Sequence, residues 1–189
     1  MYALVDCVFS AQARYESTVL PMLKNRLPRR LPDSPTLTLA DYRSDIDSFG
    51  SNRFERYAEK VLTRQVLSGR LKVEVSYEAA GFLALRGFET MDDLQSLGSE
   101  PLERLILDEL VPATRGMGPA LGDYLLILLG DETRIKLDAR LVAFLQRELG
   151  CLPDPATARQ IFNSAAALLG TSAARLENAI WKWESGSVR

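Results

Sequence analysis

Two apolar segments separated by a glycine-containing turn, within residues 99–150, constrain the fold most strongly. The first follows Ser99, which can cap a helix, and its apolar residues recur at helical spacing. The second begins at Pro119 and is apolar almost all round, so it is expected to lie centrally. Between them, the proline and two glycines of Val111–Gly118 indicate that no helix continues there. We therefore predict a core made of two helices joined by a tight turn.

Most of the remaining chain is also predicted to be helical. Asp138 and Asp154 stand where aspartate caps a helix, and Gly150 and Gly170 stand where the two helices end. The inward face of the last helix is predicted to comprise Leu176, Ala179, Ile180 and Trp183.

Helices are also expected over residues 1–13, from there to about Leu27, and from Arg53 to Leu67. Two short runs, Thr36–Leu39 and Lys72–Tyr77, instead alternate apolar and polar residues, a pattern typical of strands. They are predicted either to pair as a small ribbon or to remain extended loops. The loop is favoured, because an isolated two-stranded pair is only marginally stable.

The amino-acid composition excludes several kinds of chemistry. The 189 residues fit one compact domain or two small lobes, and 47% are hydrophobic, which is typical of a soluble globular protein. The chain has no histidine, which excludes Ser-His-Asp catalysis, Cys-His catalysis and histidine metal sites. The cysteines, Cys7 and Cys151, are too few for a zinc site or an iron–sulfur cluster. No metal site is expected, and catalysis must rest on Asp, Glu, Lys, Tyr, Ser or Cys.

The charge and hydropathy patterns bear on partners and location. The net charge of −2 argues mildly against a nonspecific nucleic-acid coat but leaves room for a local basic face. Basic residues gather in two clusters. The first contains Arg14, Lys24, Arg26, Arg29 and Arg30, and the second contains Arg134, Lys136, Arg140 and Arg147. No stretch is apolar enough to span a membrane and no signal peptide is seen, so a cytoplasmic location is expected.

The predicted turn has a possible chemical use. Glycines at positions 116 and 118 would let the backbone turn sharply and approach a ligand closely. The amides of the turn and of the next helix N-terminus would then point outward and could bind a phosphate. A Gly-x-Gly sequence alone is weak evidence, and its position between two apolar helices strengthens it.

These segments resemble a known family. Arg115–Ala120, a buried helix, and then Ile135–Asp138 are similar to the signature of the helix-hairpin-helix DNA glycosylases, which include endonuclease III and the adenine mismatch glycosylase. Gly118 and Asp138 are twenty residues apart, as are the last hairpin glycine and the catalytic aspartate in endonuclease III.

The resemblance extends beyond the hairpin, with differences. Leu4–Ala13 resembles the family helix that ends in Ser-x-Gln, and Gly50–Lys60 resembles a later helix entered by a glycine turn. Members that cleave the strand carry lysine where this chain has Ala120, and the four-cysteine cluster of endonuclease III is absent. Because a Schiff base needs an amine, no lyase activity is expected.

The resemblance implies site residues. Asp138 corresponds to the catalytic carboxylate of the family, which stabilises an oxocarbenium-like transition state or activates water. The alternative role of Asp138 is that of a plain helix cap. Gln12 corresponds to the residue that fills the gap left by the extruded base; its alternative is an ordinary polar residue at a helix end. Lys136 is expected to contact a phosphate or to be solvated. The predicted DNA contacts are Gln12, Gly116, Met117, Gly118, Lys136 and Arg140.

These considerations lead to one expected architecture and function. We expect an all-α fold of two helical lobes with a cleft between them: residues 40–138, with the hairpin at about 102–129, and residues 1–39 with 139–189. The expected function is excision of a damaged, mismatched or modified base from double-stranded DNA, by a monomer that needs no cofactor apart from an optional monovalent cation on the hairpin. The alternatives are a noncatalytic DNA-binding module and a protein-interaction module on the same scaffold.

Overall fold

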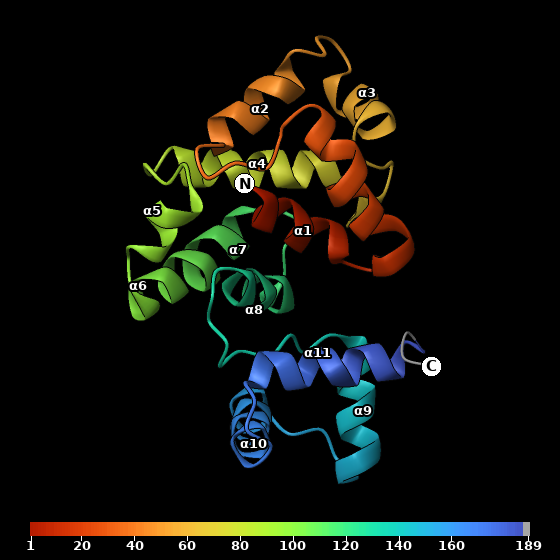
Figure 1. Cartoon of the computed structure of the whole chain (residues 1–189), viewed down its shortest axis with the longest axis vertical. Helices are drawn as coiled ribbons and strands as arrows, with labels where there is room; N and C mark the ends of the chain where they lie inside the picture. Colours follow the sequence, from red (N-terminus) through yellow and green to blue (C-terminus); the bar gives the residue numbers. More distant parts are fainter. Residues whose placement is uncertain (187–189) are drawn as a thin grey trace. The chain divides into compact units, whose positions relative to one another are not determined.

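The computed structural model describes residues 1–186, and within them the chain is mostly helical (Figure 1). The α-helices of the first half are α1 (Tyr2–Ser10), α2 (Leu39–Asp47), α3 (Arg53–Lys60), α4 (Lys72–Ala84) and α5 (Met91–Gln95). Those of the second half are α6 (Ser99–Glu103), α7 (Val111–Ala113), α8 (Pro119–Leu128), α9 (Ala139–Leu149), α10 (Pro155–Leu168) and α11 (Ala173–Glu184). The all-α class predicted from the sequence is confirmed.

Shorter elements complete the chain. Three segments with wider, π-helical turns are η1 (Tyr15–Val19), η2 (Met22–Arg26) and η4 (Arg104–Leu110), and η3 (Leu27–Arg29) is a 3₁₀ turn. Strands β1 (Val66–Leu67) and β2 (Arg70–Leu71) form a minimal antiparallel pair. None of the helices in the described part of the chain is both long and apolar enough to cross a membrane.

The chain divides by its internal contacts into two units, Met1–Leu125 and the part from Leu126 onward. This boundary differs from the expected lobes, 40–138 and 1–39 with 139–189. The N-terminal segment belongs to the first unit, and not to a lobe with the C-terminal helices, because α1 packs on α4. The C-terminal helices build a core of their own with the segment before α9.

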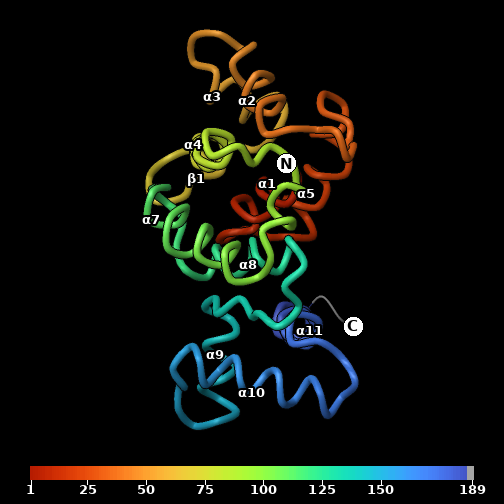
Figure 2. Tube along the Cα trace, turned by 90° about the vertical axis from the view of Figure 1, so that its left-hand side faces the viewer, coloured from red at the N-terminus to blue at the C-terminus, as the bar shows by residue number. Residues whose placement is uncertain are grey.

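The first unit is organised around α4, which packs against α2 on one side and α1 on the other (Figures 1 and 2). The alternating run Lys72–Tyr77 is the first half of this helix, so the prediction of an extended segment there is wrong. The Glu74 carboxylate caps the start of the helix by accepting the Leu71 amide at 3.1 Å. Because α4 is buried on nearly all sides, the alternation of its first residues does not mark a sheet face.

Other predicted boundaries in this unit shift as well. The helix expected from Arg53 to Leu67 ends at Lys60, and the chain then forms the β1–β2 turn at Ser68 and Gly69, which both have positive φ. The helix expected up to Leu27 is present as the irregular segments η1 to η3.

The two apolar helices predicted between residues 99 and 130 are present. The first is a continuous run of α6, η4 and α7, which ends at Ala113 rather than before Val111. The second, α8, starts at Pro119 as predicted. Gly122 of α8 lies against the first run: a Cβ atom there would be 2.9 Å from Cγ2 of Val111, so glycine allows the two helix backbones to approach closely.

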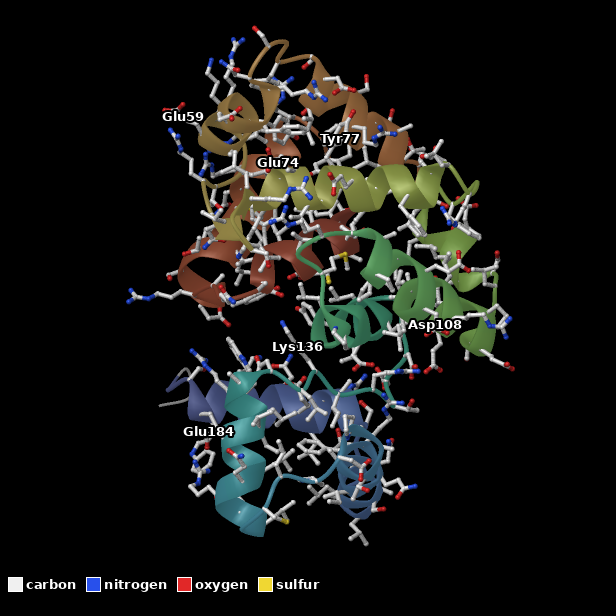
Figure 3. All side chains as sticks on the ribbon, turned by 180° about the vertical axis from the view of Figure 1, so that it is seen from behind. Glu59, Glu74, Tyr77, Asp108, Lys136 and Glu184 are labelled. Atoms are coloured by element: carbon white, nitrogen blue, oxygen red, sulfur yellow. The ribbon has the colours of Figure 1, made fainter. Side chains whose placement is uncertain are left out.

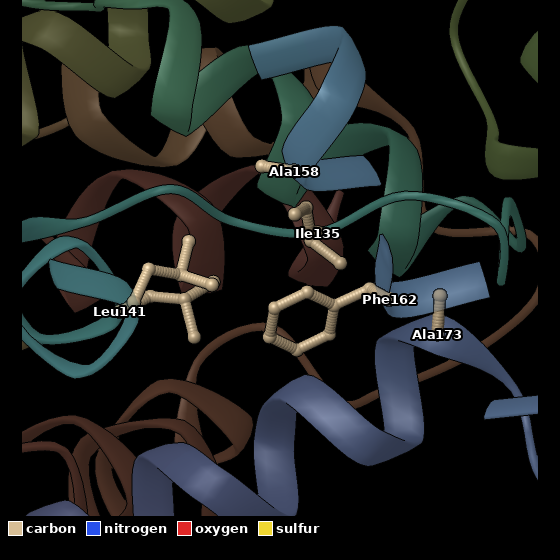
Figure 4. Close-up of a cluster of buried hydrophobic side chains, with 6 residues drawn as sticks. Ile135, Leu141, Ala158, Phe162 and Ala173 are labelled. Carbon is tan, nitrogen blue, oxygen red and sulfur yellow. The ribbon is translucent and has the colours of Figure 1, made fainter. Parts of the chain in front are cut away.

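The C-terminal unit has its own hydrophobic core (Figure 4). Its buried members are Ile135, Leu141, Leu145, Ala158, Phe162 and Ala173. The predicted starts of α9 at Asp138 and of α10 at Asp154 are confirmed. The predicted inward face of α11 is partly wrong: Ala179 is exposed and Trp183 is 60% exposed. The inward face is instead centred on Ala173, Glu177 and Ile180, because the helix is rotated relative to the prediction.

Candidate active site

Asp138 caps the N-terminus of α9. Its backbone is extended (φ −84°, ψ 176°), and its Oδ1 accepts hydrogen bonds from the amides of Arg140 at 3.0 Å and Leu141 at 3.1 Å. These two amides are at the positive end of the helix dipole, so they hold the carboxylate in a fixed orientation. The side chain is half-exposed. The cap is therefore formed, and the carboxylate is still accessible from outside.

Asp154 provides a matched comparison, because it caps α10 in the same way. Its Oδ1 accepts the amides of Ala156 and Thr157 at 3.0 and 3.1 Å. Its Oδ2 also accepts the Thr157 hydroxyl at 2.6 Å. Within residues 1–186, Oδ2 of Asp138 accepts no hydrogen bond. Asp138 thus has one oxygen fixed by the backbone and one oxygen available to a ligand.

A second carboxyl interacts with Asp138. Glu177, on the inward face of α11, is only 6% exposed. Burial, together with the charge of Asp138, raises the pKa of Glu177 to about 7, and the charge of Lys136 partly opposes this rise. Two carboxyl groups whose surroundings differ in this way are typical of acid–base sites.

Basic side chains accompany the two carboxyls. Lys136 lies in the extended segment before α9, half-exposed (Figure 3). The guanidinium of Arg140 lies over the ring of Trp181, 4.8 Å from its centroid, which ties the first turn of α9 to α11. The other basic residues of the predicted cluster serve the fold: Arg134 is buried in an ion pair with Asp131, and Arg147 pairs with Glu148 and Glu184.

The turn between α7 and α8, residues 114–118, contains the predicted phosphate site. Gly116 has φ +108°, which strongly favours glycine, and a Cβ atom there would be 3.3 Å from Cγ2 of Val75. The Met117 side chain is buried and its amide donates to the carbonyl of Thr114 at 3.0 Å. Gly118 has open space around it. Of the three predicted hairpin contacts, the two glycines are therefore the accessible ones.

The hairpin carbonyls are the expected position for a monovalent cation. The Arg70 guanidinium is 3.5 Å from the carbonyl oxygen of Arg115, and it also pairs with Glu78 at 2.6 Å. Arg70 also lies 3.7 Å from Glu74, so two carboxylates balance its charge, and the Arg115 carbonyl already accepts a donor from this guanidinium.

Gln12 follows α1 in a turn. Its φ is +50°, a left-handed conformation that is uncommon for a residue other than glycine, and its side chain is exposed. The turn is held by Lys72, whose buried ammonium donates to the carbonyls of Phe9 and Ala11 and to Oε1 of Gln65. The predicted wedge residue is thus presented on a rigidly supported turn.

One known protein family matches nearly the whole chain. A family model described as a domain of unknown function (DUF8548) matches residues 1–185. The chain belongs to this family. No curated protein and no solved structure matches it.

The predicted site residues fall into two groups. The C-terminal unit brings Asp138, Lys136 and Arg140 together, and the N-terminal unit contains Gln12 and the hairpin residues 116–118.

Sequence reasoning missed three residues in this DUF8548 chain. Glu177 could have been found as the charged residue that follows Ala173 by four positions and precedes Ile180 by three, on the apolar face of α11. Gly122 could have been found as the glycine inside the apolar α8. Lys72 was concealed by the misleading alternation at the start of α4.

Proposed function

We propose that this chain is a monofunctional DNA glycosylase, which excises a damaged, mismatched or modified base from double-stranded DNA and leaves the strand intact. Asp138 is its catalytic carboxylate. The observation that carries the proposal is the arrangement of Asp138: two backbone amides fix one oxygen, and the other accepts no hydrogen bond within residues 1–186.

This arrangement suits the chemistry of base excision. When the bond between sugar and base breaks, positive charge develops on the sugar, and a fixed carboxylate oxygen stabilises it or accepts a proton from the attacking water. The amide donors keep the carboxylate oriented, so little reorganisation is needed during the reaction. Asp154, whose second oxygen is already bonded to Thr157, lacks this possibility.

The hairpin supports DNA as the partner. Gly116 and Gly118 border a turn from which backbone amides can reach a phosphate, at the N-terminus of α8. Such contacts position the protein on any duplex without reading its sequence. In the proposal the enzyme acts as a cytoplasmic monomer without a required cofactor, and Gln12 fills the space left by the extruded base.

Two residues support the absence of lyase activity. Ala120 is the position at which bifunctional relatives place their amine, and a methyl group cannot attack the sugar. The buried ammonium of Lys72 donates to three oxygen acceptors, so its protons are engaged in holding the N-terminal turn.

An excision screen tests the proposal. Duplex oligonucleotides that carry different damaged, mismatched or modified bases are incubated with the protein and then treated with alkali, which cuts only at abasic sites. We expect alkali-dependent cleavage of at least one duplex, and a protein that binds duplexes but excises nothing would contradict the proposal.

A noncatalytic DNA-binding module is the second candidate, and the outward face of α11 favours it. A groove of about 500 Å³ on this face is lined by Arg175, Asn178, Ala179, Lys182 and Trp183. Cations beside an exposed tryptophan can bind nucleic acid by charge and stacking without any chemistry. Binding without excision in the same screen would favour this candidate.

A further inference from the structure

The groove on α11 is formed by one face of a single helix. Its lining residues, Arg175, Asn178, Ala179, Lys182 and Trp183, recur at helical spacing, so their side chains project on the same side of α11. Since a helix rises about 1.5 Å per residue, the lining spans about 12 Å along the helix. Ala179, in the middle, has only a methyl group. The longer side chains before and after it therefore border a hollow of about 500 Å³.

Trp183 is an unusually exposed aromatic residue at the C-terminal end of this lining. Its side chain is 60% exposed, although tryptophan is highly buried on average and is enriched where proteins bind partners. Trp181, on the same helix, is instead half-buried, and its ring lies beneath the Arg140 guanidinium at 4.8 Å from the ring centroid. The two tryptophans of α11 thus differ, and the exposed one lines the groove.

The Trp183 ring is supported from α9. The guanidinium of Arg147 lies over this ring, 5.7 Å from its centroid. The same guanidinium donates hydrogen bonds to the carboxylates of Glu148 and Glu184, each at 2.7 Å. These charge-assisted bonds hold the guanidinium, and the cation–π contact in turn supports the ring. The ring is therefore held in place while most of its surface remains accessible.

The groove is positively charged. Arg175 and Lys182 contribute two positive charges, and none of the described lining side chains is acidic. Arg175 is 3.4 Å from Glu132, but the two side chains are 74% and 54% exposed, so this pair is weak and another anion can replace it. Charge complementarity favours an anionic occupant, and the accessible ring favours one that carries flat aromatic groups.

We propose that the groove on α11 binds single-stranded DNA, with phosphates beside Arg175 and Lys182 and an unpaired base stacked on Trp183. A cationic groove combined with an aromatic ring is the usual way in which proteins hold a single strand without reading its sequence. In a duplex, neighbouring bases cover both faces of each base, so only an unpaired base can stack on the ring. The stacking site is independent of Asp138, whereas the choice of DNA over RNA rests on the proposed function.

Tryptophan fluorescence of the full chain tests the stacking, because either tryptophan can be made the only one. Trp181→Phe leaves Trp183, and Trp183→Phe leaves Trp181. Each variant keeps an aromatic ring, and its melting temperature is measured as a check on folding. Both are titrated with a thymidine oligomer of about ten nucleotides. We expect strong quenching in Trp181→Phe and little in Trp183→Phe, and equal quenching in both, or none in either, would overturn the inference.

Affinities for a labelled thymidine oligomer separate stacking from charge. Trp183→Ala should bind about tenfold more weakly, as expected for the loss of one stacked base. Lys182→Gln should reduce the slope of log affinity against log salt concentration by about 0.7, which corresponds to one phosphate contact. Lys60→Gln, at an exposed lysine of α3, should leave both quantities unchanged. An unchanged affinity in Trp183→Ala, or an unchanged slope in Lys182→Gln, would contradict the proposed contacts.

Three further ligands identify the occupant. A base-free oligomer of the same length has the charge but cannot stack, a blunt duplex offers no unpaired base, and a uridine oligomer represents RNA. We expect the first two to quench Trp183 much less than the thymidine oligomer does, and the third to bind no more tightly. Equal quenching by either of the first two, or tighter binding of the uridine oligomer, would overturn single-stranded DNA as the occupant. Single-strand binding without excision of any base would reject only the glycosylase function, and excision without quenching of Trp183 would reject only the groove site.

Discussion

At the scale of single residues, the two aspartate caps have similar backbone contacts and differ in one carboxylate oxygen. Asp138 and Asp154 hold the first amides of their helices with nearly the same distances. They differ in the second oxygen, which Thr157 binds in Asp154. A cap can be predicted from a few neighbouring residues, whereas the availability of its second oxygen depends on the side chains of the first helical turn and on those packed nearby.

Glu177 should make stability depend on pH. Its folded-state pKa of about 7 is above the ordinary 4.5, so the folded chain holds the proton more tightly than the unfolded chain. The resulting stabilisation is fully present below about pH 4.5 and is lost as pH rises to about 7. Across this pH range we expect the wild type to lose on the order of 3 kcal/mol of its free energy of unfolding. Glu177→Gln should lose less, because its side chain does not ionise. Urea denaturation at several pH values measures it, and parallel curves for the two proteins would contradict the expectation.

At the scale of elements, the sequence predicts where helices start and end better than it predicts which of their residues are buried. Pro119, Asp138 and Asp154 mark helix starts correctly, because capping depends on local backbone geometry. The prediction for the segment at Lys72 is wrong, because a helix covered on nearly all sides has no polar face to reveal its period. The place of Glu177 on α11 depends on the rotation of that helix in the core, which tertiary packing decides.

The hairpin allows a test of phosphate binding that leaves the fold intact. A Cβ atom at Gly118 would have no heavy atom within 4 Å, and the residue has no left-handed φ, so other residues fit. Serine and aspartate both favour the start of a helix, and only aspartate adds negative charge where a phosphate is expected. We expect Gly118→Asp to weaken binding to every duplex by about tenfold and Gly118→Ser to change it little. Equal affinities of the two variants in a fluorescence titration would show that the hairpin has only a structural role.

At the scale of the whole molecule, the chain contains two units and a modest net charge of −2. The all-α class follows from helical periodicity that extends through most of the sequence. The division near Leu125 was not predicted, because the packing of α1 on α4 joins segments far apart in the sequence. The proposed binding to DNA would depend on local surfaces, such as the hairpin, rather than on overall charge.

The product of the reaction tests the monofunctional assignment for the whole chain. The lysines are Lys24, Lys60, Lys72, Lys136 and Lys182. Because none of them occupies position 120, we expect intact strands with abasic sites and no protein–DNA adduct after borohydride treatment. A strong trapped adduct with the wild-type protein would refute this assignment, and Lys136 would then be the first residue to replace, as the lysine nearest to Asp138 in sequence.

Paired asparagine variants test whether Asp138 is a catalytic carboxylate, as we propose, and not only a helix cap. Asparagine caps a helix about as well as aspartate, so Asp138→Asn and Asp154→Asn should both remain folded, with melting temperatures close to that of wild type. Excision of the best substrate from the screen is then measured under single-turnover conditions. We expect Asp138→Asn to lose about 10²-fold or more in rate while it still binds the duplex, and Asp154→Asn to retain wild-type activity. If Asp138→Asn excises the base as fast as Asp154→Asn, Asp138 is only a helix cap.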